Sequence, residues 1–346
     1  MDGTTSVSTS HRRRATLKDV ALASGLSQST TSRALSGEGY VAAAARERVL
    51  AAARDLGYVP HAMARSLRKQ VSRAIGVLVS DLRDPFYADL SAGIGAAARA
   101  RGYTMMLVAD QGLEAEQQAA AQAFVGTRAA GVIVTPLSAA VSEYLRSQGT
   151  PVVEVDRHFS AGDCDSVTID NETVARRITE HLLSLGHRRI GLLIDETVWT
   201  TGSERMAGYE HALEDAGLEV DRGLIISAGS DVAAAREAVV DMLARRVRPT
   251  AIFAANSLLA EGLWRAAHDL GLRIPADLSI VAFDDAQWMS MVDPGITAIA
   301  QDAVALGRAA MEQLLSRIAD PEGPAVSIVH EARIVPRGST AAPADH

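Results

Sequence analysis

The chain has 346 residues, of which 48% are hydrophobic and 22% charged, with a formal net charge of −8 at pH 7. Its single cysteine, Cys164, excludes an internal disulfide and a zinc site built from several cysteines. Residues 1–72 hold eleven Lys and Arg against five Asp and Glu, whereas the rest of the chain holds 23 against 37, and a basic head on an acidic body favours attraction to DNA phosphates.

Residues 1–14 are predicted to be a disordered, basic arm, and residues 15–59 to form three short helices. Thr16 is placed to cap the first helix, and Asp19 to reach back to it. Gly25 then supplies a tight turn before the second helix, which Ser27 caps. This is the layout of an all-α helix-turn-helix domain.

The second helix is predicted to point four polar side chains outward, those of Gln28, Ser29, Ser32 and Arg33. Gln suits an adenine edge, Arg a guanine edge, and Ser either, so this face suits base reading. Ala34 and Leu35 close the underside. In the third helix, from Ala43 to Leu56, the inward side chains are expected to be Val49, Leu50, Ala53 and Leu56.

Residues 60–72 are predicted to be a hinge helix and linker. The helix itself, residues 60–70, is marginal in isolation because it is shorter than about 12 residues. Leu67 is the apolar side chain placed to enter a minor groove, and Arg68 is placed to meet a phosphate. A plain packing contact is the alternative for Leu67.

The run from Thr16 to Gln70 resembles the head of the bacterial LacI/GalR family of transcriptional regulators, in its elements VALASGLS, SR, GYVP and ARSL. The resemblance implies base contacts at Gln28, Ser29 and Arg33. It also implies an intercalating leucine at Leu67 with Ala64 beside it.

Beyond the hinge, nine apolar runs alternate with amphipathic stretches and predict parallel strands between helices. The runs are AIGVLV, YTMMLVA, GVIVTP, PVVEVD, SVTID, RIGLLI, LIISAG, AIFAAN and LSIVAFDD. Residues 73–336 are long enough for two lobes. The tail, residues 337–346, is predicted to be disordered and unable to form a tetramerising helix.

The body resembles the effector domain of the same family, which shares its fold with periplasmic sugar-binding proteins. The marks are DPFYADL, VDR at Asp156, IDN, HLLSLGHRRIGLL, SERMAGY, PTAIFAANSLLAEGL and IPADLSIVAFDD. The resemblance implies a type I periplasmic-binding-protein-like fold, with the chain crossing between lobes near Asp170, Gln301 and Asp320.

Effector-binding candidates follow from the same resemblance. Arg205 matches a ligand-gripping arginine, Asp284 an opposing acid and Asn256 an amide. The remaining candidates are Phe86, Tyr87, Asp156, Trp199, Thr201 and Phe253. The alternatives are a surface ion pair for Arg205, a loop cap with Asp285 for Asp284, and core packing for each aromatic side chain.

Four positions depart from the family pattern. Thr31 replaces a valine under the second helix, and Ala42 replaces a serine cap, at a cost of about 1 kcal/mol. Ser257 replaces an aspartate, and Asp195 replaces a glycine. The last two fall at the edge of the expected ligand pocket.

These features predict a cytoplasmic, nucleoid-associated repressor that binds a near-palindromic operator as a homodimer and responds to a small molecule, with a sugar or glycoside preferred. No apolar segment approaches the roughly 20 residues of a membrane span, and no signal peptide opens the chain. An enzyme is not expected, because catalytic and metal motifs are missing, and no cofactor or metal is predicted. Two alternatives stay open: a small-molecule binding protein with a non-functional head, and a nonspecific architectural DNA binder.

Overall fold

The structure, a computed structural model, describes residues 15–37, 39–58, 72–159, 162–229, 231–245 and 248–344. The chain divides into two compact units, residues 1–72 and 73–346. The predicted arm and the predicted hinge residues Ala64, Leu67 and Arg68 lie outside the described residues.

Three helices form the described part of the first unit: α1 (Leu17–Ser24), α2 (Gln28–Ser36) and α3 (Ala43–Asp55). The Thr16 side chain accepts from the Asp19 amide, and the Asp19 carboxylate accepts from the Thr16 amide, so the predicted capping box is present. Ser27 caps α2 by accepting from the Thr30 amide. Gly25 takes the left-handed conformation between the two helices, with φ of 66°.

The core of this unit is small and is built from Val20, Ala34, Val49 and Ala53. The prediction that Leu50 and Leu56 point inward is wrong, because their side chains are 43% and 42% exposed. Val49 and Ala53 share one face of α3, and Leu50 is turned about 100° from that face. Leu56 follows the last helical residue.

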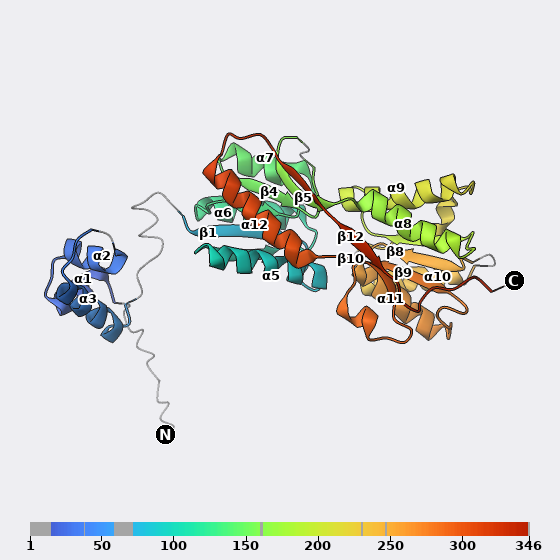
Figure 1. Cartoon of the computed structure of the whole chain (residues 1–346), viewed down its shortest axis with the longest axis horizontal. Coiled ribbons are helices and arrows are strands. Elements are labelled where there is room, and N and C mark those ends of the chain that lie inside the picture. The colour runs from blue at the N-terminus through green and yellow to red at the C-terminus, as the bar shows by residue number, and fades with distance from the viewer. Residues whose placement is uncertain are drawn as a thin grey trace, which may run out of the picture. The chain divides into compact units, whose positions relative to one another are not determined.

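The second unit contains two lobes, each built on a six-stranded sheet (Figure 1). The first sheet has the strand order β11-β5-β4-β3-β1-β2. Helices α5 and α12 lie side by side on one of its faces (Figure 1), while α6 and α7 pack together against a cluster on strands β1, β3 and β4. The elements of this lobe are β1 (Ala74–Val79), α5 (Pro85–Ala100), β2 (Thr104–Ala109), α6 (Glu114–Gly126), β3 (Val132–Val134), α7 (Ala139–Ser147), β4 (Val152–Val155), β5 (Asp165–Ile169), α12 (Ala303–Ala319) and β11 (Ser327–His330).

The second sheet has the order β12-β10-β9-β8-β6-β7. Helices α8 and α9 pair along one side of this lobe, and α10 and α11 pair in a separate apolar cluster (Figure 1). The elements are α8 (Asn171–Ser184), β6 (Ile190–Ile194), α9 (Thr200–Asp215), η1 (Arg222–Leu224), β7 (Ile225–Ser227), α10 (Val232–Leu243), β8 (Ala251–Ala254), α11 (Ser257–Asp269), β9 (Ser279–Phe283), η2 (Gln287–Ser290), β10 (Thr297–Gln301) and β12 (Ala332–Val335).

Close contact between α5 and α12 depends on glycine. A Cβ at Gly93 would collide with the carbonyl of Val304, and a Cβ at Gly307 would collide with the carbonyl of Leu90. The run GIGAAARARG, which begins at Gly93, therefore serves helix packing within the first lobe.

All nine predicted strands are present, and three further strands, β10, β11 and β12, were not predicted. Strand β12 runs antiparallel to β10, so the second sheet is mixed where only parallel pairing was expected. Strands β11 and β12 have four residues each and no fully buried residue. Their apolar signal is correspondingly weak.

The chain passes between the lobes after Asp170, at Asp302 and at Glu331, the residue between β11 and β12. The expectation of a third crossing near Asp320 is wrong, because Asp320 caps the end of α12 within the first lobe. The unpredicted strand β11 pairs with β5, which keeps the chain in this lobe for about ten more residues.

The prediction of a disordered tail is wrong for residues 337–344. The Ser339 hydroxyl is buried, donates to the Ile280 carbonyl at 2.6 Å and accepts from the Thr297 amide at 2.8 Å. The Ala341 carbonyl accepts from His187 at 2.9 Å. In the described part of the chain, no helix has the length and apolarity needed to cross a bilayer.

Candidate functional site

Helix α2 has one exposed polar face and one buried face. Gln28, Ser29 and Arg33 are exposed and Ser32 is half-buried, while Ala34 lies underneath in the core. The Arg33 guanidinium lies along the helix, donating from Nη2 to the Ser29 hydroxyl at 3.2 Å and from Nε to the Ser29 carbonyl at 3.4 Å. This arrangement presents a Gln, a Ser and an Arg on one surface, as base reading requires.

Thr16 lies at the start of α1 and is exposed. Its hydroxyl donates to the Asp19 carboxylate at 2.7 Å, and its amide donates to the same oxygen at 2.8 Å. Both donors of Thr16 are therefore already bonded to a carboxylate, and its contact with DNA stays a prediction.

The two departures in the head have clear structural consequences. Thr31 is fully buried, and its hydroxyl has no hydrogen-bond partner among the described residues. Ala42 stands at the N-cap of α3 and makes no side-chain cap. Both substitutions are therefore expected to lower the stability of the head.

In the second unit, a cavity lies between the lobes at the carboxyl ends of the parallel strands, where open α/β sheets bind ligands. Its volume is 30 Å³, which is room for only a few water molecules. Seven of the nine predicted effector residues line it: Phe86, Tyr87, Asp156, Thr201, Arg205, Asn256 and Asp284. The other lining residues are Ser80, Asp81, Asp84, Arg157, Asp195 and Leu258.

Asp156 and Asp284 occupy corresponding places in the two lobes. Asp156 follows β4 and Asp284 follows β9, each the third strand in its sheet order. Both residues have left-handed backbone conformations, with φ of 68° and 63°. Such a conformation is uncommon for a residue other than glycine, although aspartate adopts it more readily than most, and residues that adopt it cluster at functional sites.

Arg205 on α9 is buried and does not form a surface ion pair. Its Nε donates to Asn171 Oδ1 at 2.9 Å and its Nη1 to the Ala255 carbonyl at 2.6 Å. Its guanidinium lies 3.5 Å from the ring centroid of Phe283. These contacts hold the charge in place at the cavity wall, ready for a ligand hydroxyl or carboxylate.

Asp284 accepts a hydrogen bond of 2.6 Å from Gln301 Nε2, while its neighbour Asp285 pairs with Arg337 at 2.6 Å, so the two acids do not form a joint loop cap. Burial raises the pKa of Asp284 to about 7, although Arg205 opposes the shift. Burial also raises the pKa of Asp84, against hydrogen bonds from Phe86 and Ser257.

Tyr87, Asp156 and Arg157 form a buried polar chain. The Tyr87 hydroxyl donates to Asp156 Oδ2 at 3.0 Å and accepts from Arg157 Nη2 at 3.0 Å. Burial, the largest influence, raises the pKa of Tyr87 well above its ordinary value, so this hydroxyl stays neutral.

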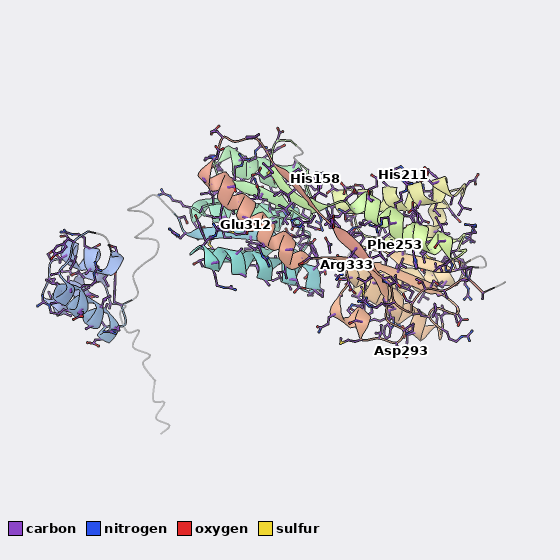
Figure 2. The ribbon with its side chains drawn as sticks, in the orientation of Figure 1. His158, His211, Phe253, Asp293, Glu312 and Arg333 are labelled. Atoms are coloured by element: carbon purple, nitrogen blue, oxygen red, sulfur yellow. The ribbon has the colours of Figure 1, made fainter. Side chains whose placement is uncertain are left out.

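Two predicted aromatic candidates do not line the cavity. Phe253 is fully buried in strand β8, and Figure 2 shows it within the second lobe, so the prediction that it faces the cleft is wrong. Helices cover both faces of this sheet, and Phe253 packs into the larger core cluster. Trp199 does not line the cavity either, but its ring lies 3.7 Å from the guanidinium carbon of Arg157, which does.

Direct contacts join the lobes at the cavity. The Ser257 hydroxyl in the second lobe donates to Asp84 in the first, and the His158 amide donates to the Thr200 hydroxyl at 3.2 Å. Figure 2 shows His158 at the junction of the two lobes. The lobes are therefore held closed by polar contacts as well as by the crossing segments.

Sequence reasoning did not select Arg157 or Asp195 as ligand contacts. Both follow strand ends, which was the signal that could have identified them: Arg157 comes two residues after β4 and Asp195 directly after β6. Within the described residues, no group of three His, Cys, Asp or Glu side chains is arranged to hold a metal ion.

A helix-turn-helix unit and a two-lobed α/β unit with a polar cleft define a ligand-responsive transcription regulator. Residues 16–61 match the family described as bacterial regulatory proteins, lacI family, and residues 179–340 match the periplasmic binding protein-like domain. The chain belongs to the LacI family.

Relatives match along nearly the whole chain. The transcriptional repressor PurR of Photobacterium profundum is 31% identical over 323 residues, covering 92% of this chain and 95% of the relative. The repressor CytR of Escherichia coli is 32% identical over 333 residues, covering 95% and 97%. These relatives are described as repressors and not as enzymes.

Solved structures give the same result. The Lac repressor dimer bound to operator and the anti-inducer ONPF aligns with a TM-score of 0.84 at 28% identity, covering 95% of this chain and all of that one. The complex of the regulator CelR with cellobiose aligns with a TM-score of 0.72 at 28% identity, covering 94% and 100%.

Proposed function

We propose that this protein is a cytoplasmic transcriptional repressor that binds a near-palindromic operator as a homodimer and is controlled by a small molecule bound between its lobes. The polar face of α2 carries the proposal, because Gln28, Ser29 and Arg33 are exposed together while Thr31 and Ala34 are buried beneath them. Helix α2 would lie in the major groove, and two heads would read half-sites about one helical turn apart. Thr16, Ser32, Ala64, Leu67 and Arg68 complete the proposed DNA contacts.

A sugar or glycoside is the proposed effector. Arg205, Asp284 and Asn256 offer a guanidinium, a carboxylate and an amide from the second lobe, and Phe86 and Tyr87 add aromatic surface from the first. Such a set suits a polyhydroxylated ring. The structural relative CelR was solved with cellobiose, and a relative from Haemophilus influenzae, 28% identical, is a ribose operon repressor.

The mechanism follows from the position of the cavity. A ligand placed between the lobes changes their relative angle, and this shifts the two hinge segments of the dimer toward or away from pairing on DNA. The coupling is reciprocal, so operator binding must change effector affinity by the same factor. Whether the effector acts as inducer or corepressor depends on which lobe angle permits the hinges to pair.

The test is selection of tight-binding sequences from a random DNA pool at near-physiological salt, with and without a panel of sugars and nucleosides. Enrichment of a near-palindrome is expected. Arg33→Ala combined with Leu67→Ala should abolish it with effector affinity retained, whereas Arg48→Ala, which removes an exposed charge on α3, should not. Equal binding to every sequence would instead support an architectural role. Ligand binding with no DNA preference would support a binding protein with a non-functional head.

A further inference from the structure

Two buried side chains at the cavity wall, Arg157 and Asp195, carry hydrogen-bonding atoms that no described protein group satisfies. Arg157 belongs to the first lobe and Asp195 to the second. Both side chains line the same cavity, one from each lobe.

Arg157 is 3% exposed. Its Nη2 donates to the Tyr87 hydroxyl at 3.0 Å, but its Nε is 3.8 Å from Asp156 Oδ2, which is too long for a hydrogen bond. Nε and Nη1 have no acceptor among the described residues. The Trp199 ring stacks on the guanidinium, so acceptors can approach only at its edge.

Asp195 is 5% exposed. Its Oδ2 accepts a long hydrogen bond of 3.4 Å from Asn256, and its Oδ1 has no donor among the described residues. The backbone around it is tightly packed, since a Cβ at Gly202 would lie 3.2 Å from Oδ1 and would collide with the carbonyl of Glu196. The carboxylate is therefore held in place and lacks one donor.

The charge of the cavity wall limits what can fill this space. Five aspartates and two arginines are among the lining residues. Burial raises the pKa of Asp84, Asp195 and Asp284, which means that the site already resists negative charge. A fully ionised phosphate or a carboxylate would satisfy Arg157, but it would offer Asp195 no proton and would add an anion to this surface.

We infer that Arg157 and Asp195 form a subsite for an uncharged ligand group that both accepts and donates a hydrogen bond, such as a sugar hydroxyl, and that Asp195 excludes phosphorylated effectors. The inference rests on the proposed role of the cleft as the effector site. It narrows the effector to neutral sugars, glycosides and nucleosides. A site built around a ligand donor discriminates strongly against analogues that lack it, because its buried acceptor is then left unpaired.

The test is calorimetric titration of the full-length protein with matched neutral and phosphorylated compounds: ribose and ribose 5-phosphate, glucose and glucose 6-phosphate, adenosine and AMP, with cellobiose as a further neutral compound. At least one neutral compound is expected to bind, with its phosphorylated partner at least about a hundredfold weaker. Asp195→Gly should weaken the neutral compound by about tenfold or more. Asp195→Asn removes the charge and keeps the shape of the side chain. It should reduce the difference in affinity between a neutral compound and its phosphorylated partner.

Asp293→Asn is the matched control, because Asp293 is exposed and Figure 2 shows it at the outer edge of the second lobe. It should change neither affinity. The inference is overturned if a phosphorylated compound binds as tightly as its neutral partner, or if no neutral compound binds. It is also overturned if Asp195→Gly leaves the affinities unchanged, because that result would mean that solvent alone satisfies Asp195. A protein that fails these tests but still selects an operator keeps the proposed function and loses only the subsite.

Discussion

The Ser257 hydroxyl donates a 3.0 Å hydrogen bond to the Asp84 carboxylate, and this bond joins the second lobe to the first. Both residues begin helices at the cavity: Ser257 is the first residue of α11, and Asp84 caps α5 by accepting from the Phe86 amide. An aspartate at position 257, the usual family residue, would place a second carboxylate against Asp84. Serine at this position therefore favours lobe closure.

Ser257→Ala should weaken closure by about 1.5–3 kcal/mol, because it leaves a buried carboxylate without this donor. Ser257→Asp should weaken it further through charge repulsion. Small-angle scattering of the ligand-free protein should report a larger radius of gyration in both variants. Ser290→Ala, at an exposed serine, is the control, and scattering curves identical to wild type for all three variants would contradict the prediction.

Thr31→Val should stabilise the head by about 1 kcal/mol, because it removes a buried hydroxyl that has no partner among the described residues. Thr30→Val should have the opposite effect, since the Thr30 hydroxyl is bonded to that of Ser27 at 2.9 Å. Amide hydrogen exchange of α1 to α3 in the full chain measures both changes. Slower exchange in Thr30→Val than in Thr31→Val would refute this account of the head.

Ala42→Ser should add about 1 kcal/mol to the stability of α3 by supplying the missing cap. Ala44→Ser places the same side chain two residues later, inside the helix, and should give no gain. The measurement is protection of the first amides of α3. Equal protection in the two variants would show that the gain does not come from capping.

Asp284→Asn should remove part of the pH dependence of folding. Because the folded-state pKa is raised to about 7 from 3.8, the folded protein keeps a proton that the unfolded chain has released between these values. The stability that the protonated Asp284 contributes is fully present below the unfolded-state pKa and is lost as pH rises through 7. The free energy of unfolding falls by at most about 4 kcal/mol over this range. Urea unfolding from pH 4 to 8 should therefore show a smaller decline in the free energy of unfolding for Asp284→Asn than for wild type. The control Asp293→Asn should show the same decline as wild type. An unchanged decline in Asp284→Asn would rule out this residue as the source.

Sequence patterns located the helix caps and the nine strands because the responsible signals are local. The Thr16 and Asp19 capping box needs residues only three positions apart. A local pattern could not tell on which face of strand β8 the Phe253 side chain lies. Its sheet is covered by helices on both faces, so Phe253 and its neighbour Ala254 are both buried and apolar alternation cannot tell their faces apart.

The tail and the buried ends of polar side chains were also beyond sequence reasoning. RGSTAAPADH has no apolar period, yet Ser339 and Ala341 bind the second lobe through single hydroxyl and carbonyl groups. Composition does not report such bonds. Likewise, the stacking of Arg157 on Trp199 joins residues 42 positions apart in different lobes, and no local pattern encodes that pairing.

The 30 Å³ volume of the interlobe cavity bears on how fast the protein can respond. A sugar ring cannot enter a space that holds only a few water molecules, so the lobes must first part, breaking contacts such as that between Ser257 and Asp84. At high effector concentration the rate of association should level off at the rate of lobe opening instead of rising without limit. At such concentrations the delay before this regulator changes state would depend on its own internal motion and not on how much effector is available.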